Sequence, residues 1–206
     1  LPVYGEVLTL ALSFNCSRYR EKDGMKYHTY PSLKYEDDRK ALWKGLIDGD
    51  LSFTATDSGF TNYMDKIAGR NVVDMRGGNI GIEIRMGVIY SEAVARNGVS
   101  LETFVNATST NAAKLLGMYP QKGAIATGSD ADICIIDPSI KKSLTMADLH
   151  VRDYSPWEGW NIEGWPTTVI LRGKIMVEDQ ELIGKPNHGQ LVTRKIDPHF
   201  LMKSSL

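Results

Sequence analysis

The chain has 206 residues, of which 42% are hydrophobic and 24% are charged, and this is ordinary usage for a sizeable globular domain. Its 24 Lys and Arg residues nearly balance its 25 Asp and Glu residues, so the net charge of −1 argues against a partner such as nucleic acid or an anionic membrane surface. Cys16 and Cys134 lie far apart and no apolar run reaches the roughly 18 residues of a membrane span, so we expect a cytoplasmic protein without disulfides.

The first 57 residues predict a βαβ unit. The apolar run 3–12 is typical of a buried parallel strand, and residues 15–36 have no regular period and predict a long loop. The stretch "DDRKALWKGLIDGD" from Asp37 has acids at its start and Gly49 near its end, which predicts an amphipathic helix. The second strand is predicted in "LSFTATD" (51–57). A chain that begins inside a predicted strand suggests a fragment.

Helices are predicted after a glycine-rich loop at residues 61–81. The stretch "IEIRMGVIYSEAVARNG" (82–98) predicts one helix, and "SLETFVNAT" predicts a second with Ser100 as its N-cap. A third helix is predicted from Asn111 and is stopped by Pro120. To this point the pattern indicates an α/β fold.

After Pro120 the pattern becomes β-rich. The stretch "KGAIATGSDADICIIDP" predicts a turn and a strand, and "TTVILRGKIMVEDQEL" predicts a hairpin around Arg172 and Gly173. Three tryptophans in "SPWEGWNIEGWP" have no basic neighbours, so we expect them to pack between the β-rich part and the α/β part, or at a subunit contact.

Asp57, in "FTATDSGF", is the most specific candidate for chemistry. It directly follows a predicted parallel strand, and ligands of such sheets bind where the carboxyl ends of the strands meet. A carboxylate there can bind a metal ion or act as a general base. The alternative is that Asp57 caps an Asx turn through "DSG", and the local pattern by itself favours that simpler interpretation.

The histidines and glycines give weaker signals. None of the four histidines has HxH or HExxH spacing, so the short motifs assemble no complete metal site. His28, in the long loop, is interpreted as a surface residue in preference to a pocket residue. The glycines of "RGGNIGIEIRM" (76–86) either approach a ligand closely or form a flexible connection, and the pattern does not separate these alternatives.

A family resemblance rests on the run "STNAAKLLGMYPQKGAIATGSDADICIIDP" (109–138), which is similar to the signature of the cyclic amidohydrolases, the dihydropyrimidinase and D-hydantoinase family. The resemblance continues through "YSPWEGWNIEGWPTTVILRGKIMVED", "GIEIRMGVIYSEAV", "KALWKGLIDGDL" and "PVYGEV". It implies an α/β carboxyl-terminal portion of such a protein. Residues 1–120 would form the last strands and helices of a TIM-type (β/α)8 metal-dependent hydrolase barrel, residues 121–185 part of a small β-sandwich, and residues 186–206 a tail.

The resemblance also implies a zinc-dependent enzyme in which a zinc-activated hydroxide hydrolyses a hydantoin, a dihydropyrimidine or a similar cyclic amide. In the family, four histidines, a carboxylated lysine and one aspartate hold two zinc ions. Asp57 matches the aspartate, which would make it both a metal ligand and the catalytic base. The other ligands, including the lysine, would lie outside this chain, so we expect the chain by itself to be inactive and the complete protein to be a homotetramer.

Some positions depart from the family pattern. Ser58 stands where the family often has histidine, and Tyr30 matches a serine that contacts the substrate. The asparagine whose backbone holds the substrate falls at Ile80 or, with a one-residue slip, at Asn79. Tyr30, Asn79 and Ile80 are therefore the candidate substrate-binding residues. The alternative function is a non-catalytic dihydropyrimidinase-like scaffold that acts through oligomerisation and binding, and the presence of Asp57 favours the enzyme.

Overall fold

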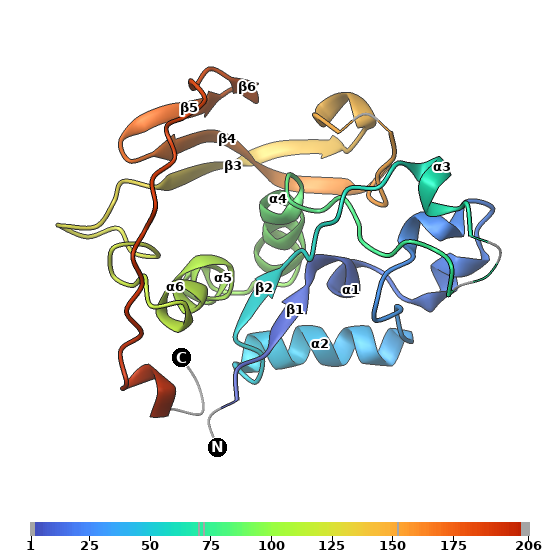
Figure 1. Cartoon of the computed structure of the whole chain (residues 1–206), viewed down its shortest axis with the longest axis horizontal. Helices are drawn as coiled ribbons and strands as arrows, with labels where there is room; N and C mark the ends of the chain where they lie inside the picture. The colour runs from blue at the N-terminus through green and yellow to red at the C-terminus, as the bar shows by residue number, and fades with distance from the viewer. Residues whose placement is uncertain (1–2, 70, 72, 152, 203–206) are drawn as a thin grey trace.

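The first part of the protein is a parallel βαβ unit (Figure 1). The structure, a computed structural model, describes residues 3–69, 71, 73–151 and 153–202. Strand β1 (Glu6–Leu8) pairs in parallel with β2 (Phe53–Ala55), and the crossover between them contains helix α2 (Glu36–Asp48). This arrangement confirms the βαβ unit predicted from the sequence.

Helix α2 is bounded and anchored by its own side chains. Three acidic residues occupy its first turn, where they interact favourably with the positive end of the helix dipole, and Gly49 ends it with a φ of 86°. Arg39 and Trp43 both donate hydrogen bonds to the Leu12 carbonyl oxygen, at 3.1 and 2.9 Å. These bonds hold the crossover helix against the segment that follows β1.

The prediction of a strand across residues 3–12 is wrong at its second half. The strand ends at Leu8, and Thr9–Ser13 forms a short helix, α1, whose residues Leu10 and Leu12 are buried. A short apolar run fits a buried strand and a buried helical turn equally well, so its periodicity does not separate them. The predicted loop at 15–36 contains two 3₁₀ turns, η1 (Cys16–Arg20) and η2 (Gly24–Tyr27).

The middle of the chain contains a short helix followed by two longer helical segments. The bounds are α3 (Tyr63–Lys66), α4 (Arg85–Ile89), the π-helical η3 (Tyr90–Arg96), α5 (Leu101–Val105), the π-helical η4 (Asn106–Thr110) and α6 (Asn111–Leu115). Ser100 caps α5 through its side chain, as predicted, by accepting a hydrogen bond from Thr103 N. Helix α6 begins at Asn111, as predicted, but it is not separate from the preceding helix, because residues 101–115 stay helical without a break.

The last part of the described chain is an antiparallel sheet. Its strands, in order across the sheet, are β3 (Ile133–Ser143), β4 (Asn161–Leu171), β5 (Lys174–Glu178) and β6 (Glu181–Leu182). Arg172 and Gly173 join β4 to β5 with φ values of 46° and 77°, the positive pair that a type I′ hairpin turn requires. The predicted hairpin is confirmed. Short 3₁₀ turns lie at Met146–Asp148 (η5) and Phe200–Met202 (η6).

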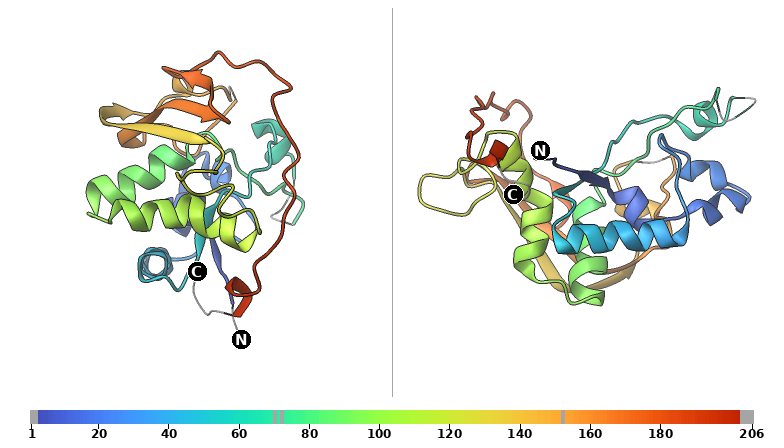
Figure 2. Two further views of the ribbon diagram at one scale, coloured as in Figure 1. Left: turned by 90° about the vertical axis from the view of Figure 1, so that its left-hand side faces the viewer. Right: turned by 90° about the horizontal axis from the view of Figure 1, so that it is seen from below.

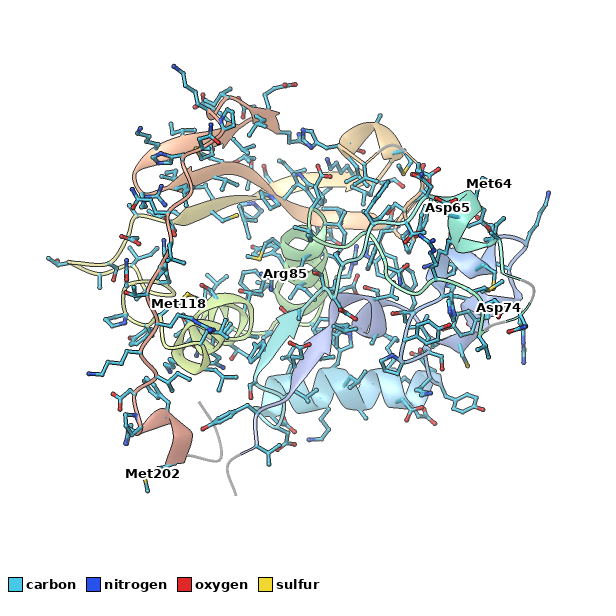
Figure 3. All side chains as sticks on the ribbon, in the orientation of Figure 1. Met64, Asp65, Asp74, Arg85, Met118 and Met202 are labelled. Atoms are coloured by element: carbon cyan, nitrogen blue, oxygen red, sulfur yellow. The ribbon has the colours of Figure 1, made fainter. Side chains whose placement is uncertain are left out.

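These elements stack in layers, which Figures 1 and 2 show from three directions. The antiparallel sheet lies over helices α4 to α6, and the β1–β2 pair with α2 lies on the far side of those helices. Arg85, the first residue of α4, lies near the centre of the molecule (Figure 3). Within the described part of the chain, no helix is both long and apolar enough to cross a membrane.

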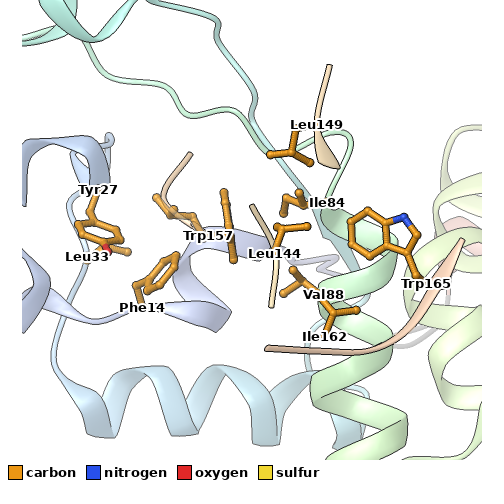
Figure 4. Close-up of a cluster of buried hydrophobic side chains, with 11 residues drawn as sticks. Phe14, Tyr27, Leu33, Ile84, Val88, Leu144, Leu149, Trp157, Ile162 and Trp165 are labelled. Carbon is orange, nitrogen blue, oxygen red and sulfur yellow. The ribbon is translucent and has the colours of Figure 1, made fainter. Parts of the chain in front are cut away.

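An aromatic core joins the sheet to the helices (Figure 4). Trp157 and Trp165 are buried in one cluster with Phe14, which follows α1, and with Val88 of α4. The indole Nε1 of Trp157 donates a hydrogen bond of 3.0 Å to the Ser13 hydroxyl, so its polar atom is satisfied inside the core. The cluster confirms that these tryptophans pack between the β-rich part and the α/β part.

We predict that Gly87→Ala lowers the free energy of unfolding by about 1–3 kcal/mol, because the new methyl group would overlap the Trp165 ring and force the sheet away from α4. Gly45→Ala is the matched control. A methyl group at Gly45 meets Leu51 at 3.5 Å, an ordinary contact, and alanine in a helix should stabilise the protein by about 0.5–1 kcal/mol. Urea unfolding of both variants measures the difference, and equal effects would contradict the prediction.

Candidate functional site

Asp57 lies just beyond the carboxyl end of β2, with its side chain exposed. Its φ is 45°, in the left-handed region, where a residue other than glycine loses about 1 kcal/mol or more. Aspartate is among the few residues that adopt this conformation routinely. Residues with such strained backbones gather at functional sites, so both the backbone conformation and the position of Asp57 make it a candidate functional residue.

The link between this strand end and its neighbours is made by Ser58, the next residue. Ser58 Oγ accepts a hydrogen bond of 2.9 Å from Gly81 N, and Ser58 forms an isolated parallel bridge with Asn79. Within the described part of the chain, no donor forms a hydrogen bond to the Asp57 carboxylate. The Asx-turn alternative, in which that carboxylate satisfies the turn, therefore has no bond to support it.

Asp57 borders two cavities. The first, of about 620 Å³, is mainly apolar and extends from Asp57 past Thr29, Pro31 and Ser32 toward β1 and α2. The second, of about 550 Å³, contains Asp57 and Ser58 together with Glu6, Thr54 and Arg85. Both volumes lie within the range of small-molecule sites. The carboxylate thus faces space large enough for a small ring compound.

Tyr30 lies on the loop between η2 and α2 and is half exposed. Its hydroxyl donates a hydrogen bond of 3.0 Å to the Met75 carbonyl oxygen, and its ring packs edge to face on the His28 ring at 4.8 Å. A methyl group at Gly77 would come within 2.5 Å of the Tyr30 ring, so the glycine permits this close approach. The structure therefore joins Tyr30 to the glycine-rich loop through Met75 and Gly77.

Asn79 and Ile80 are both buried. The Asn79 amide Nδ2 donates a hydrogen bond of 3.2 Å to the His28 carbonyl oxygen, so this side chain is used inside the protein. Because the side chains of both residues point into the structure, their backbone groups are what a ligand could contact. Tyr30 and Asn79 both contact His28, the first through its ring and the second through its carbonyl oxygen, and Asn79 also pairs with Ser58, the residue after Asp57.

Lys66, at the end of α3, is a residue that the sequence analysis missed. Its side chain has no exposed surface, and its ammonium donates to the carbonyl oxygens of His28 at 2.7 Å and Gly78 at 2.5 Å. Asn79 Oδ1 lies at 3.5 Å. Burial lowers the pKa of Lys66 to about 8. The sequence "NYMDKIAG" contains no signal that distinguishes this lysine from a surface one.

His28 is buried, with 2% of its surface exposed, so its interpretation as a surface residue is wrong. Burial lowers the pKa of His28, and the neighbouring Lys66 charge lowers it further. The pattern could not reveal this, because Lys66 and Asn79, which contact His28, lie far from it in the sequence.

Arg85, at the start of α4, holds β2 through its guanidinium group. Its guanidinium donates to Thr54 Oγ1 at 2.7 Å and to the carbonyl oxygens of Thr54 and Thr108 at 3.3 and 3.2 Å. Burial lowers the pKa of Arg85. Since Thr54 lies in β2, these bonds fix the strand that carries Asp57 against the helical layer.

The donor set does not form a complete metal centre. Across residues 3–69, 71, 73–151 and 153–202, no three His, Cys, Asp or Glu side chains gather closely enough to hold a metal ion. A catalytic zinc site takes about three protein ligands. Asp57 could contribute one ligand to such a site, and the other ligands would have to come from outside the described residues.

Comparison with known proteins gives a consistent set of relatives. A model described as the amidohydrolase family matches residues 15–176. D-hydantoinase of Geobacillus stearothermophilus is 36% identical over 200 residues, which are 94% of this chain and 42% of that protein. D-hydantoinase of Bacillus sp. AR9 superposes with a TM-score of 0.90 at 37% identity, covering 95% of this chain and 44% of that one. Dihydropyrimidinase of Brevibacillus agri NCHU1002 gives 0.89 at 36% identity, covering 93% and 43%. The chain thus spans about two fifths of the length of these relatives.

We predict that Ser58→Ala lowers the free energy of unfolding by about 1–3 kcal/mol, because it leaves the buried Gly81 N–H without its acceptor. Ser139→Ala is the control, since Ser139 is exposed and bonds only to the neighbouring Asp137 side chain in the described structure, so its effect should stay within about 0.5 kcal/mol. Denaturant unfolding compares the two, and an equally small effect at Ser58 would show that its hydroxyl does not hold the glycine-rich loop.

Proposed function

Because the chain belongs to the amidohydrolase family, we propose that it is part of an enzyme that hydrolyses a cyclic amide, such as a hydantoin or a dihydropyrimidine. The names of its relatives, D-hydantoinase and dihydropyrimidinase, support this substrate class. The observation that carries the proposal is the Asp57 carboxylate, which is exposed at the end of a parallel strand, strained in its backbone and open to a cavity.

Strands β1 and β2 fit a place as neighbouring strands of a (β/α)8 barrel. They pair in parallel through a helical crossover, and Val7 and Thr54 are buried against the helical side. On the other face, Glu6 is exposed, and Leu8, Phe53 and Ala55 are only partly buried. A barrel interior would cover that face, and the antiparallel sheet would then belong to a separate β-sandwich beginning after residue 120.

Asp57 has the chemistry of a proton carrier. A carboxylate can take a proton from the attacking water and deliver it to the leaving amide nitrogen, which must be protonated before the ring opens. Its position at the end of β2, held by the Thr54–Arg85 contacts, keeps the carboxylate at one place relative to the cavity. The backbone around Asn79 and Ile80, with Tyr30 beside it, would hold the ring.

We further propose that the complete protein binds two zinc ions, with Asp57 as one ligand and a carboxylated lysine from outside this chain as another. Bound zinc would lower the pKa of water to near ~7 and polarise the amide carbonyl, and an unactivated amide needs both effects. Within the described residues, Asp57 would supply the ligand at the end of β2. We propose a homotetramer for the complete protein, in line with the family resemblance.

We predict that Asp57→Asn in the complete protein lowers kcat at least ~100-fold, because the side-chain amide of asparagine cannot accept the proton of the attacking water. The fold should be kept, since the side chain is exposed, and circular dichroism and the unfolding temperature should stay near those of the unmodified protein. Asp50→Asn, a change of the same kind in the exposed segment before β2, is the control and should leave kcat unchanged. Near-normal turnover of Asp57→Asn would rule out its role.

Metal analysis tests the zinc proposal separately. We predict two zinc ions per complete protein, loss of activity after chelation and recovery when zinc is returned. Residues 1–206 by themselves should retain no stoichiometric zinc, because Asp57 would lack its fellow ligands. Two zinc ions bound to the isolated chain, or full activity of a metal-free complete protein, would contradict the prediction.

A further inference from the structure

Lys66 stands out because it is a fully buried ammonium that the proposed chemistry does not use. Within the described part of the chain, no carboxylate forms an ion pair with it, and its contacts are oxygen atoms of backbone carbonyls and one amide. Burying an ammonium group costs several kcal/mol unless its N–H donors form hydrogen bonds. A lysine kept there must satisfy groups that would otherwise be unpaired.

The acceptors of Lys66 belong to two different loops. His28 lies two residues before Tyr30, in the crossover between β1 and β2. Gly78 and Asn79 lie in the glycine-rich loop, directly before Ile80. Asn79 Nδ2 also donates to the His28 carbonyl oxygen, so the ammonium and the amide hold the same oxygen. One side chain thus ties together the two segments that carry the candidate substrate contacts.

The same cluster is fixed to the catalytic strand. Asn79 pairs with Ser58, the residue after Asp57, and Gly81 N donates to Ser58 Oγ. Among the described residues, the titratable groups recorded beside Lys66 are His28 and Tyr154, and the Tyr154 ring centroid lies 5.9 Å from Nζ. A continuous set of contacts therefore runs from Tyr30 through Lys66 and Asn79 to the strand end.

We propose that Lys66 is a positioning residue that sets the distance between the substrate-binding loops and Asp57, so that it governs substrate binding without touching the substrate. This inference rests on the proposed function, because the substrate contacts come from it. The ammonium has three N–H donors and accepts nothing, and these donors match the His28, Gly78 and Asn79 oxygens that converge on it. An apolar side chain of similar length would leave the Gly78 carbonyl without this donor and the His28 carbonyl with Asn79 Nδ2 alone, so the two loops would be free to move apart.

The test compares Lys66→Met with the unmodified complete protein by kinetics on a hydantoin and by amide hydrogen exchange. We expect KM to rise about tenfold while kcat changes less than about threefold, because binding geometry is lost and Asp57 is intact. Amides of residues 28–30 and 77–81 should exchange at least about tenfold faster, and those of α2 should not change. Val88→Ala, which loosens the aromatic core elsewhere, is the control for general destabilisation and should leave KM unchanged.

Lys66→Gln keeps two N–H donors without the charge and should give an intermediate KM and intermediate exchange, and it carries the comparison if Lys66→Met does not fold. Unchanged exchange in both loops would contradict the inference that Lys66 holds the two loops together. Faster exchange with an unchanged KM, or a rise in KM that Val88→Ala shares, would overturn the positioning role. An unmodified protein that opens no cyclic amide would instead refute the proposed function, and the exchange data would still decide whether Lys66 holds the loops.

Discussion

The parallel pairing of β1 and β2 is the constraint from which the candidate site follows. Parallel strands cannot be joined by a tight turn, so the chain between Leu8 and Phe53 must leave the sheet, cover one face and return. Helix α2 makes that return, and Arg39 and Trp43 anchor it to the Leu12 carbonyl. Since both strands run the same way, Asp57 and the loop that carries Thr29 and Pro31 border a single cavity.

Two cations, Lys66 and Arg85, hold the backbone near the end of β2 and in the loops beside it. The loops at the strand ends have no ladder of their own, and their carbonyl groups need donors when they are buried. Lys66 donates to the loop carbonyls of His28 and Gly78, whereas Arg85 donates to the carbonyls of Thr54 in β2 and Thr108 in η4 and so holds the strand against the helices. In the described structure neither cation has a carboxylate in an ion pair. Each therefore acts as a multiple hydrogen-bond donor, and its charge strengthens each bond.

The elements with strong local signals could be predicted from the sequence. Acids and Gly49 bound α2, Ser100 caps α5, and Arg172 with Gly173 makes the hairpin turn. The local sequence pattern did not predict the structure where contacts between distant residues determine secondary structure or burial.

The apolar run after Leu8 became helical. The helix at Asn111 was predicted, but the chain before it stayed helical as well, because no Gly or Pro separates the two predicted helices. His28 and Lys66 are polar residues in irregular segments, and only the meeting of two distant loops buries them. The position of Asp57 at a strand end followed from the sequence, whereas its backbone conformation and its lack of a described hydrogen-bond donor required the structure.

The state of Asp57 bears on the choice between a hydrolytic enzyme and a binding scaffold. A left-handed aspartate in an ordinary turn is compensated when its carboxylate accepts a backbone hydrogen bond. Here Ser58 makes the bond to the neighbouring loop, and Asp57 retains both the strain and an exposed carboxylate that no described donor engages. A scaffold gains nothing from that combination, whereas a hydrolase needs a carboxylate that lies at a fixed strand end and is open to its reactants. The local energetics therefore support the proposed hydrolytic function.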